Sequence, residues 1–147
     1  MKNTRVWNLV SENKKFKNKT SSFENILGEV IELKPDVLDG VAGDGAVFSS
    51  IEDMVIWNAF WNQNSLLSKE TIKEAFKTSK LNNNTQNNYG FGWLVINNDS
   101  HWHNGSWLGA RTTIIRNTKL ENCIVVLDNS ASLNTDSIVK ELVKVLK

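Results

Sequence analysis

The second half of the chain is built from short runs that alternate apolar and polar residues or are rich in β-branched and aromatic side chains, which predicts β-strands. Four such runs cover residues 89–96, 102–107, 110–116 and 122–127, and polar turns such as residues 97–99 separate them. Connections this short join neighbouring strands that run in opposite directions. The sequence therefore predicts an antiparallel meander of about four strands.

Two helices are predicted before these strands and one after them. The first begins at Ser49, which fits a capping box with Glu52, the second begins near Ser68, and the last begins at about Thr135. Their apolar faces are formed by Met54, Val55, Ile56, Trp57, Phe60 and Trp61 in the first helix, by Ile72, Ala75 and Phe76 in the second, and by Ile138, Leu142, Val145 and Leu146 in the last.

The N-terminal part of the chain is less regular. Residues 5–10 are predicted to form a short strand, residues 11–22 a solvated loop or hairpin turn, and residues 23–33 are ambiguous. Residues 39–46 contain three glycines, which free the backbone. Because no Lys-Ser or Lys-Thr pair follows them, the pattern does not favour a phosphate-binding loop.

This order of elements predicts an α+β fold, an antiparallel sheet of about four strands preceded by helices and closed by a C-terminal helix. A length of 147 residues suits a single domain over residues 1–147. The run from Ile124 to Leu127 is apolar on both faces, which favours a central strand over an edge strand. The sheet is therefore expected to need a neighbour that these elements do not supply.

Composition narrows the function mainly by exclusion. The net charge of +1, from 17 basic and 16 acidic residues, provides no basic surplus for a nucleic-acid backbone. No apolar run approaches the ~18 residues of a membrane helix. The first residues lack the apolar core of a signal peptide, and the compartment stays open. The single cysteine, Cys123, lies in an apolar run and is expected to pack as a small buried residue.

Candidate chemistry is concentrated between His101 and Arg111, where polar, aromatic and glycine residues meet between predicted strands. Such side chains rarely gather there merely to hold strands together. His101 and His103 point to one face of a strand, as two metal ligands would. No third or fourth ligand accompanies them in the sequence, so neither a metal nor another cofactor is expected.

Three segments in a fixed order resemble one protein family. Residues 43–57 (GDGAVFSSIEDMVIW) look like a glycine-rich turn and helix of serine β-lactamase-related proteins, and residues 89–93 (YGFGW) look like the aromatic strand that follows. Residues 103–109 (HNGSWLG) are similar to the third active-site motif, and residues 127–129 to the close of the last strand. The family comprises class C β-lactamases and penicillin-binding-protein-like esterases and peptidases of the CubicO type. The match begins at about residue 39 and is weak over residues 1–38.

The resemblance implies acyl transfer to an activated serine, followed by hydrolysis of an amide, ester or β-lactam. It implies that His103 is the cationic or hydrogen-bonding side chain at the cleft wall and that the Ser106 amide is an oxyanion donor. Asn104 would face either the substrate or the helical side, and Arg111 would contact a substrate carboxylate or form a salt bridge. The candidate substrate-binding residues are Asn104, Gly105, Trp107 and Arg111.

The family's other two motifs do not fit this sequence. The family uses Ser-x-x-Lys and Tyr-x-Asn, but the single tyrosine, Tyr89, is followed by Gly90-Phe91. Ser-x-x-Lys occurs at Ser11 in a polar segment and at Ser137 in the C-terminal helix, after the third motif instead of before it. The chain is therefore expected to be a C-terminal portion without the nucleophile, inactive alone, whose missing N-terminal half is absent or supplied by another chain. The alternative is a non-catalytic binding or interaction module that retains the fold.

Overall fold

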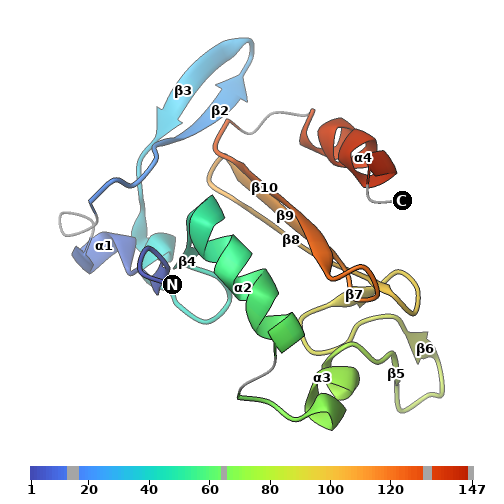
Figure 1. Cartoon of the computed structure of the whole chain (residues 1–147). Coiled ribbons are helices and arrows are strands. Elements are labelled where there is room, and N and C mark those ends of the chain that lie inside the picture. Colours follow the sequence, from blue (N-terminus) through green and yellow to red (C-terminus); the bar gives the residue numbers. More distant parts are fainter. Residues whose placement is uncertain (13–16, 64–65, 131–133, 146–147) are drawn as a thin grey trace.

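The computed structural model describes residues 1–12, 17–63, 66–130 and 134–145. Its centre is a four-stranded antiparallel sheet with the strand order β10-β9-β8-β7 (Figure 1). Each strand pairs with its neighbour in sequence, which confirms the predicted meander. The strands are β7 (Leu94–Val95), β8 (Ser100–Trp107), β9 (Ala110–Asn117) and β10 (Asn122–Asp128).

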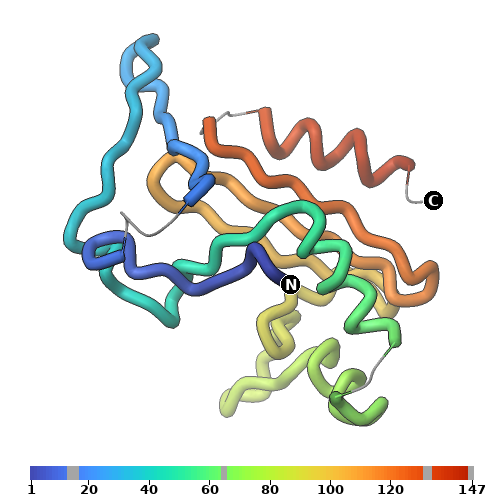
Figure 2. Tube along the Cα trace, turned by 60° about the vertical axis from the view of Figure 1, so that its left-hand side comes forward, coloured from blue at the N-terminus to red at the C-terminus, as the bar shows by residue number. Residues whose placement is uncertain are grey.

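Helices cover both faces of this sheet. Helix α2 (Ile51–Gln63) and helix α4 (Thr135–Val145) both contact β10 and lie on opposite sides of the sheet (Figure 1, Figure 2). Helix α3 (Lys69–Ala75) follows α2 and is capped by the Ser68 side chain. The three predicted helices and the sheet confirm the α+β class. Within the described residues, no helix has the length and apolar character that a membrane span needs.

The N-terminal part forms small peripheral elements. Strand β1 (Arg5–Val6) pairs with β4 (Val47–Phe48), so the strand predicted over residues 5–10 is shorter than expected. Helix α1 (Leu9–Glu12) begins where that strand was predicted to continue, and it contacts the 3₁₀ helix η2 (Val37–Gly40). Of the loop predicted over residues 11–22, residues 13–16 lie outside the described part of the chain.

Two hairpins occupy segments that the sequence left without a firm structure. Strands β2 (Ser22–Ile26) and β3 (Glu29–Leu33) form a hairpin that projects from the body of the molecule (Figure 2). Strands β5 (Ser79–Lys80) and β6 (Gln86–Asn87) form a smaller one. The strand predicted over residues 89–96 contributes only β7, because Gly90 and Gly92 form a tight turn in which the Gly90 amide donates to the Trp93 carbonyl at 2.7 Å.

The predicted capping box of α2 is displaced by one residue. Ser50, and not Ser49, accepts a hydrogen bond from the Asp53 amide at 3.3 Å. Ser49 instead bonds to the hydroxyl of Thr4 at 2.8 Å, and Asp53 accepts from two backbone amides of the N-terminal segment. Ser50 is therefore the serine that caps α2, whereas Ser49 and Asp53 bond to the N-terminal segment.

The prediction that residues 124–127 form a central strand is wrong for this chain. Strand β10 is at one end of the strand order and pairs with β9 alone among the described strands. Its apolar character on both faces has another cause, since α2 and α4 contact it from opposite sides. A strand whose two faces are both covered by helices is apolar on both faces, whether it lies at the centre or at the end of its sheet.

The buried core lies between α2, α3 and the end of the sheet that holds β7. Trp93 is only 5% exposed, and its ring lies 5.4 Å from that of Phe76 and 6.1 Å from that of Trp61. Trp61 also contacts Trp57 edge-on. The apolar side chains that are buried in the described residues are Leu9, Ala75, Trp93 and Ile115.

Candidate active site

The candidate residues of β8 divide between the two faces of the sheet. Side chains directly opposite one another on paired strands share a face, and alternate residues of one strand point to opposite faces. His101 pairs with Arg116, whose guanidinium lies 5.8 Å from the Trp61 ring of α2. His101, His103, Gly105 and Trp107 therefore share the face that α2 covers, whereas Asn104, Ser106 and Arg111 belong to the face of α4.

His103 is exposed and held by a tyrosine. The hydroxyl of Tyr89 lies 3.2 Å from His103 Nδ1. Tyr89 follows β6, and an isolated antiparallel bridge to Leu94 places it beside the sheet. The structure thus joins the third predicted motif to the aromatic segment YGFGW through a side-chain contact.

The backbone of Ser106 faces an open edge of β8. The amide of Ile96 donates to the Ser100 carbonyl, so the backbone groups of Ser100 point toward β7. Backbone groups alternate in direction along an antiparallel strand, so those of Trp102, Asn104 and Ser106 point the same way. Strand β7 pairs with β8 only at His101 and Trp102 among the described strands. The Ser106 amide therefore points away from β9, toward an edge that β7 does not reach.

Trp107 is anchored at its indole nitrogen. Its Nε1 donates to Asp39 Oδ1 at 3.0 Å, although 56% of the side chain is exposed. Asp39 itself is buried and also accepts from the Asp36 amide at 2.6 Å, which closes the capping box of η2. Trp107 thus borders the face of His103 in a fixed position, as a residue at a cleft margin would.

Two glycines shape this end of β8. A Cβ on Gly105 would lie 2.8 Å from Thr112 Oγ1. Gly109, in the β8–β9 turn, has a φ of +74°, and a Cβ there would lie 2.1 Å from the Phe23 carbonyl oxygen. The hairpin β2–β3 therefore packs directly on this turn through backbone that only glycine admits.

The structure does not bring Asn104 and Arg111 to His103. The Nη1 atom of Arg111 donates to Ser106 Oγ at 2.7 Å on the other face, directly across from it on the paired strand. The register places Asn104 on the face that α4 contacts, which is the helical side of its two alternatives. The roles of both residues toward a substrate stay predictions.

His101 belongs to the core. It is 2% exposed, its ring lies 4.3 Å from the Phe76 ring, and it stands opposite Arg116, which is 1% exposed. Burial lowers the pKa of His101, the nearby Arg116 lowers it further, and a hydrogen bond to the Phe76 backbone opposes both. Two basic groups in one buried site do not favour a cation, and His103 is directed to Tyr89, so the two histidines do not form a metal pair.

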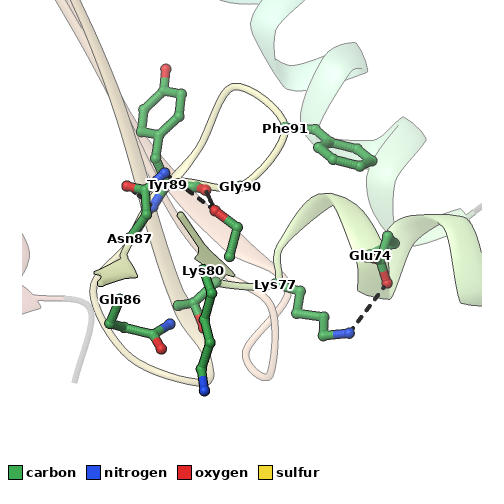
Figure 3. Close-up of a pocket in the computed structure, with 10 residues that line it drawn as sticks. Glu74, Lys77, Lys80, Gln86, Asn87, Tyr89, Gly90 and Phe91 are labelled. Atoms are coloured by element: carbon green, nitrogen blue, oxygen red, sulfur yellow. Dashed lines mark hydrogen bonds and ion pairs between the residues drawn. The ribbon is translucent and has the colours of Figure 1, made fainter. Parts of the chain in front are cut away.

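Two cavities flank these residues. The larger, of about 630 Å³, is lined by Glu74, Lys77, Lys80, Asn87, Tyr89 and Phe91 among others (Figure 3). Figure 3 shows that the Tyr89 ring extends away from the two lysines, so its hydroxyl serves β8 and not this cavity. The smaller, of about 340 Å³, lies at the β8–β9 turn and is lined by Ser106, Trp107 and Arg111 together with Glu24 and Leu33 of the β2–β3 hairpin.

Comparison with known proteins supports the family resemblance found in the sequence motifs. The family described as Beta-lactamase matches residues 4–145. The chain belongs to the β-lactamase family. It is also similar to penicillin-binding protein 4* of Bacillus subtilis (strain 168), with 33% identity over 96 residues, or 63% of this chain. The match covers 21% of that relative, so the chain spans about a fifth of its length. The resemblance drawn from the motifs is confirmed, and with it a serine hydrolase or acyltransferase family.

Two residues of this candidate site were missed by sequence reasoning. Tyr89 was considered only as a failed Tyr-x-Asn, although it is the single tyrosine of the chain and lies within a matched segment. Asp39 was seen only as part of a glycine-rich stretch. Nothing in the local sequence indicates that Asp39 lies beside Trp107, because the two are 68 residues apart.

Proposed function

We propose that this chain supplies one wall of a serine acyl-transfer site and not the nucleophile. The observation that carries the proposal is the open edge of β8, along which the Ser106 amide points outward beside the exposed His103 side chain. An outward amide at this position can donate to the oxyanion that forms when a serine attacks a carbonyl. His103 would bind an acceptor group of the substrate, and Gly105 would leave room for close approach.

The serines that carry a Ser-x-x-Lys pattern do not meet this wall. Ser137 lies on α4, on the other side of the sheet from α2, and its Oγ donates to the Asn134 carbonyl at 2.8 Å. Ser11 lies in the four-residue helix α1, and its partner Lys14 falls outside the described residues. The reacting serine is therefore proposed to come from residues beyond this sequence. The complete site would act on an amide, ester or β-lactam.

The surface of the chain supports a missing neighbour. Its accessible area is 10576 Å², whereas a compact protein of 16.6 kDa exposes about 7600 Å². Strand β10 ends the sheet, so a further strand can add to its edge. We propose that an N-terminal half, from a longer chain or a second one, pairs along this edge. Because an absent neighbour would cover the excess surface, X-ray scattering that gives the isolated chain the dimensions of a complete compact domain of 16.6 kDa would contradict this pairing.

Covalent labelling tests the catalytic part of the proposal. The 147-residue chain is incubated with a fluorescent penicillin and separately with a fluorophosphonate, and adducts are located by mass spectrometry. We expect no stoichiometric adduct. A stoichiometric adduct on Ser11 or Ser137 would overturn the proposal, because the chain would then carry its own nucleophile.

A chimaera tests the wall itself. The matched segment of penicillin-binding protein 4* is replaced by this chain, and covalent penicillin labelling is compared for the parent chimaera, His103→Ala and Leu120→Ala. Leu120 lies in the β9–β10 turn, at the opposite end of β9 from the β8–β9 turn. We expect labelling of the parent and of Leu120→Ala, and slower labelling of His103→Ala. A folded chimaera that binds penicillin without forming the adduct would favour the alternative of a binding module.

A further inference from the structure

The contact between Tyr89 and His103 has a direction. We propose that Tyr89 is a positioning residue whose hydroxyl donates to His103 Nδ1 and so holds the imidazole proton on Nε2. His103 then presents an N–H donor to the substrate, and the substrate accepts that hydrogen bond with an oxygen. The consequence for substrates rests on the proposed function, whereas the state of the ring is a property of the chain itself.

The geometry first establishes which nitrogen is engaged. The Tyr89 oxygen lies 3.2 Å from Nδ1, within hydrogen-bond distance. The second ring nitrogen, Nε2, is on another edge of the imidazole and points away from Tyr89. Both side chains are exposed, so Nε2 is the ring nitrogen that an incoming group can reach.

The chemistry of the two groups decides the donor. A hydroxyl can donate or accept, and a neutral imidazole has one nitrogen of each kind. A phenol O–H is a stronger donor than a neutral imidazole N–H, and an imidazole lone pair is a stronger acceptor than a phenol oxygen. The arrangement O–H···Nδ1 is therefore the favoured one, and it leaves the ring proton on Nε2.

The backbone around Tyr89 is fixed, so its hydroxyl is not placed by chance. A Cβ on Gly90 would lie 2.3 Å from the Ala75 carbonyl oxygen, so the turn packs directly against the end of α3. The Phe91 amide donates to that same carbonyl at 2.9 Å. On the other side, the Ser79 hydroxyl donates to the Tyr89 carbonyl at 3.3 Å. The close packing of Gly90 on Ala75 thus fixes the backbone that places the tyrosine ring beside β8.

This arrangement restricts what His103 can do. With the proton on Nε2 and Nδ1 occupied, neither nitrogen is free to remove a proton from a nucleophile. His103 instead matches a carbonyl or carboxylate oxygen of a bound substrate. The site would therefore select substrates with an acceptor group at this position.

Chemical modification of the 147-residue chain tests the proposal. Diethyl pyrocarbonate acylates the unprotonated nitrogen of a neutral imidazole, and peptide mapping by mass spectrometry measures its rate at each histidine in mildly alkaline buffer. In the wild-type chain, the unprotonated nitrogen of His103 is the one that Tyr89 occupies. We expect Tyr89→Phe to raise the rate at His103 about fivefold, the population factor of a hydrogen bond of about 1 kcal/mol. The buried His101 stays slow in both proteins and serves as the internal control.

Nitrogen NMR of chain labelled with ¹⁵N-histidine gives a second readout that a purely structural role would not produce. The long-range proton–nitrogen correlations of His103 are expected to show the proton on Nε2 in the wild type. The Nδ1 resonance is expected to shift in Tyr89→Phe, while the His101 resonances stay unchanged. Leu120→Ala, in the β9–β10 turn, keeps the hydroxyl of Tyr89 and the segment around it, and is expected to leave the His103 resonances close to those of the wild type.

Three outcomes would overturn the proposal. They are a proton on Nδ1 of His103 in the wild type, equal modification rates in the wild type and Tyr89→Phe, and unchanged Nδ1 shifts. The first needs only the wild-type chain, so the proposal can fail even if the variant does not fold. A chimaera that is not labelled would contradict the proposed function of the chain but would not affect the measurements of the His103 ring. The two proposals can therefore fail separately.

Discussion

Strand β8 carries two histidines on one face, two residues apart, in opposite environments. His101 is 2% exposed, packs on Phe76 and stands opposite the buried Arg116. His103 is exposed and contacts the hydroxyl of Tyr89. The strand, the face and the residue type are the same, so none of these explains the difference.

The difference comes from what lies beside each half of the strand. The half that holds His101 is paired on both edges, by β7 and β9, and is covered by Phe76 beside the end of α3. The half from His103 to Trp107 is paired only by β9 among the described strands. One strand thus serves as core at one end and as a candidate site at the other, and four experiments test that division.

The largest expected effect is at the buried end. Trp93→Ala removes a ring that is 5% exposed and contacts Trp61 and Phe76, so we expect a loss of about 3–5 kcal/mol in the free energy of unfolding. Urea denaturation followed by tryptophan fluorescence and circular dichroism measures it. The control is Phe91→Ala, an aromatic residue that is 69% exposed, for which we expect a change within about 0.5 kcal/mol. Equal losses would show that the burial of Trp93 does not set its contribution to stability.

The next effect is at the turn that anchors the open end. Gly109→Ala places a methyl group 2.1 Å from the Phe23 carbonyl oxygen and requires a φ of +74°, so we expect a loss of about 2–3 kcal/mol. Gly92→Ala is the matched control, because its φ is +77° and its Cβ would meet nothing within 4 Å. We expect it to cost about 1 kcal/mol. The difference between the two stability losses measures how much the packing of the β2–β3 hairpin on this turn contributes. Equal losses would show that this packing contributes nothing.

A smaller effect is the pH dependence of stability that the buried His101 causes. Burial and Arg116 lower the pKa of His101 in the folded chain, so the unfolded chain takes up the proton first as the pH falls. The stability from a neutral His101 is therefore complete above about pH 6.5 and is lost as the pH falls below that value. Urea midpoints between pH 8 and pH 5 measure it. We expect His101→Gln to flatten this dependence. A variant with the same dependence as the wild type would show that His101 is not the group responsible.

The smallest effect concerns the anchor of Trp107. Trp107→Phe keeps an aromatic ring but removes the Nε1 donor to the buried Asp39, so we expect a loss of about 1 kcal/mol. In Asp39→Asn the amide oxygen still accepts this bond, and we expect the indole fluorescence of Trp107 to change less than in Asp39→Ala. A Trp107→Phe variant as stable as the wild type would show that the bond does not hold this residue.

Local sequence patterns correctly predicted the helices and strands that form from residues close together in the chain. The strands after residue 100 and the helix from Thr135 follow from alternation, helical spacing and polar turns. Predictions were wrong where a distant segment decided the outcome. Ser49 bonds to Thr4 while Ser50 caps α2, and the helices on both faces of β10 explain an apolar pattern that was assigned to a central strand.

The candidate site shows the same division. The sequence placed His103, Gly105 and Ser106 on one strand and indicated a polar wall, because a strand's register follows from its turn. It could not place Tyr89 on His103 or Asp39 on Trp107, which lie 14 and 68 residues apart. Such contacts depend on how the Gly90 turn packs on α3 and how η2 meets the end of β8.

The sequence by itself determined the family, the antiparallel strands and which residues of β8 share a face, because these depend on short-range spacing and side-chain alternation. Tertiary structure alone decided which of two equivalent histidines is buried, which edge of β8 stays open and which hydroxyl meets the exposed imidazole. Those outcomes depend on the packing of segments that are far apart in the chain, and packing depends on shape and burial that no local pattern records.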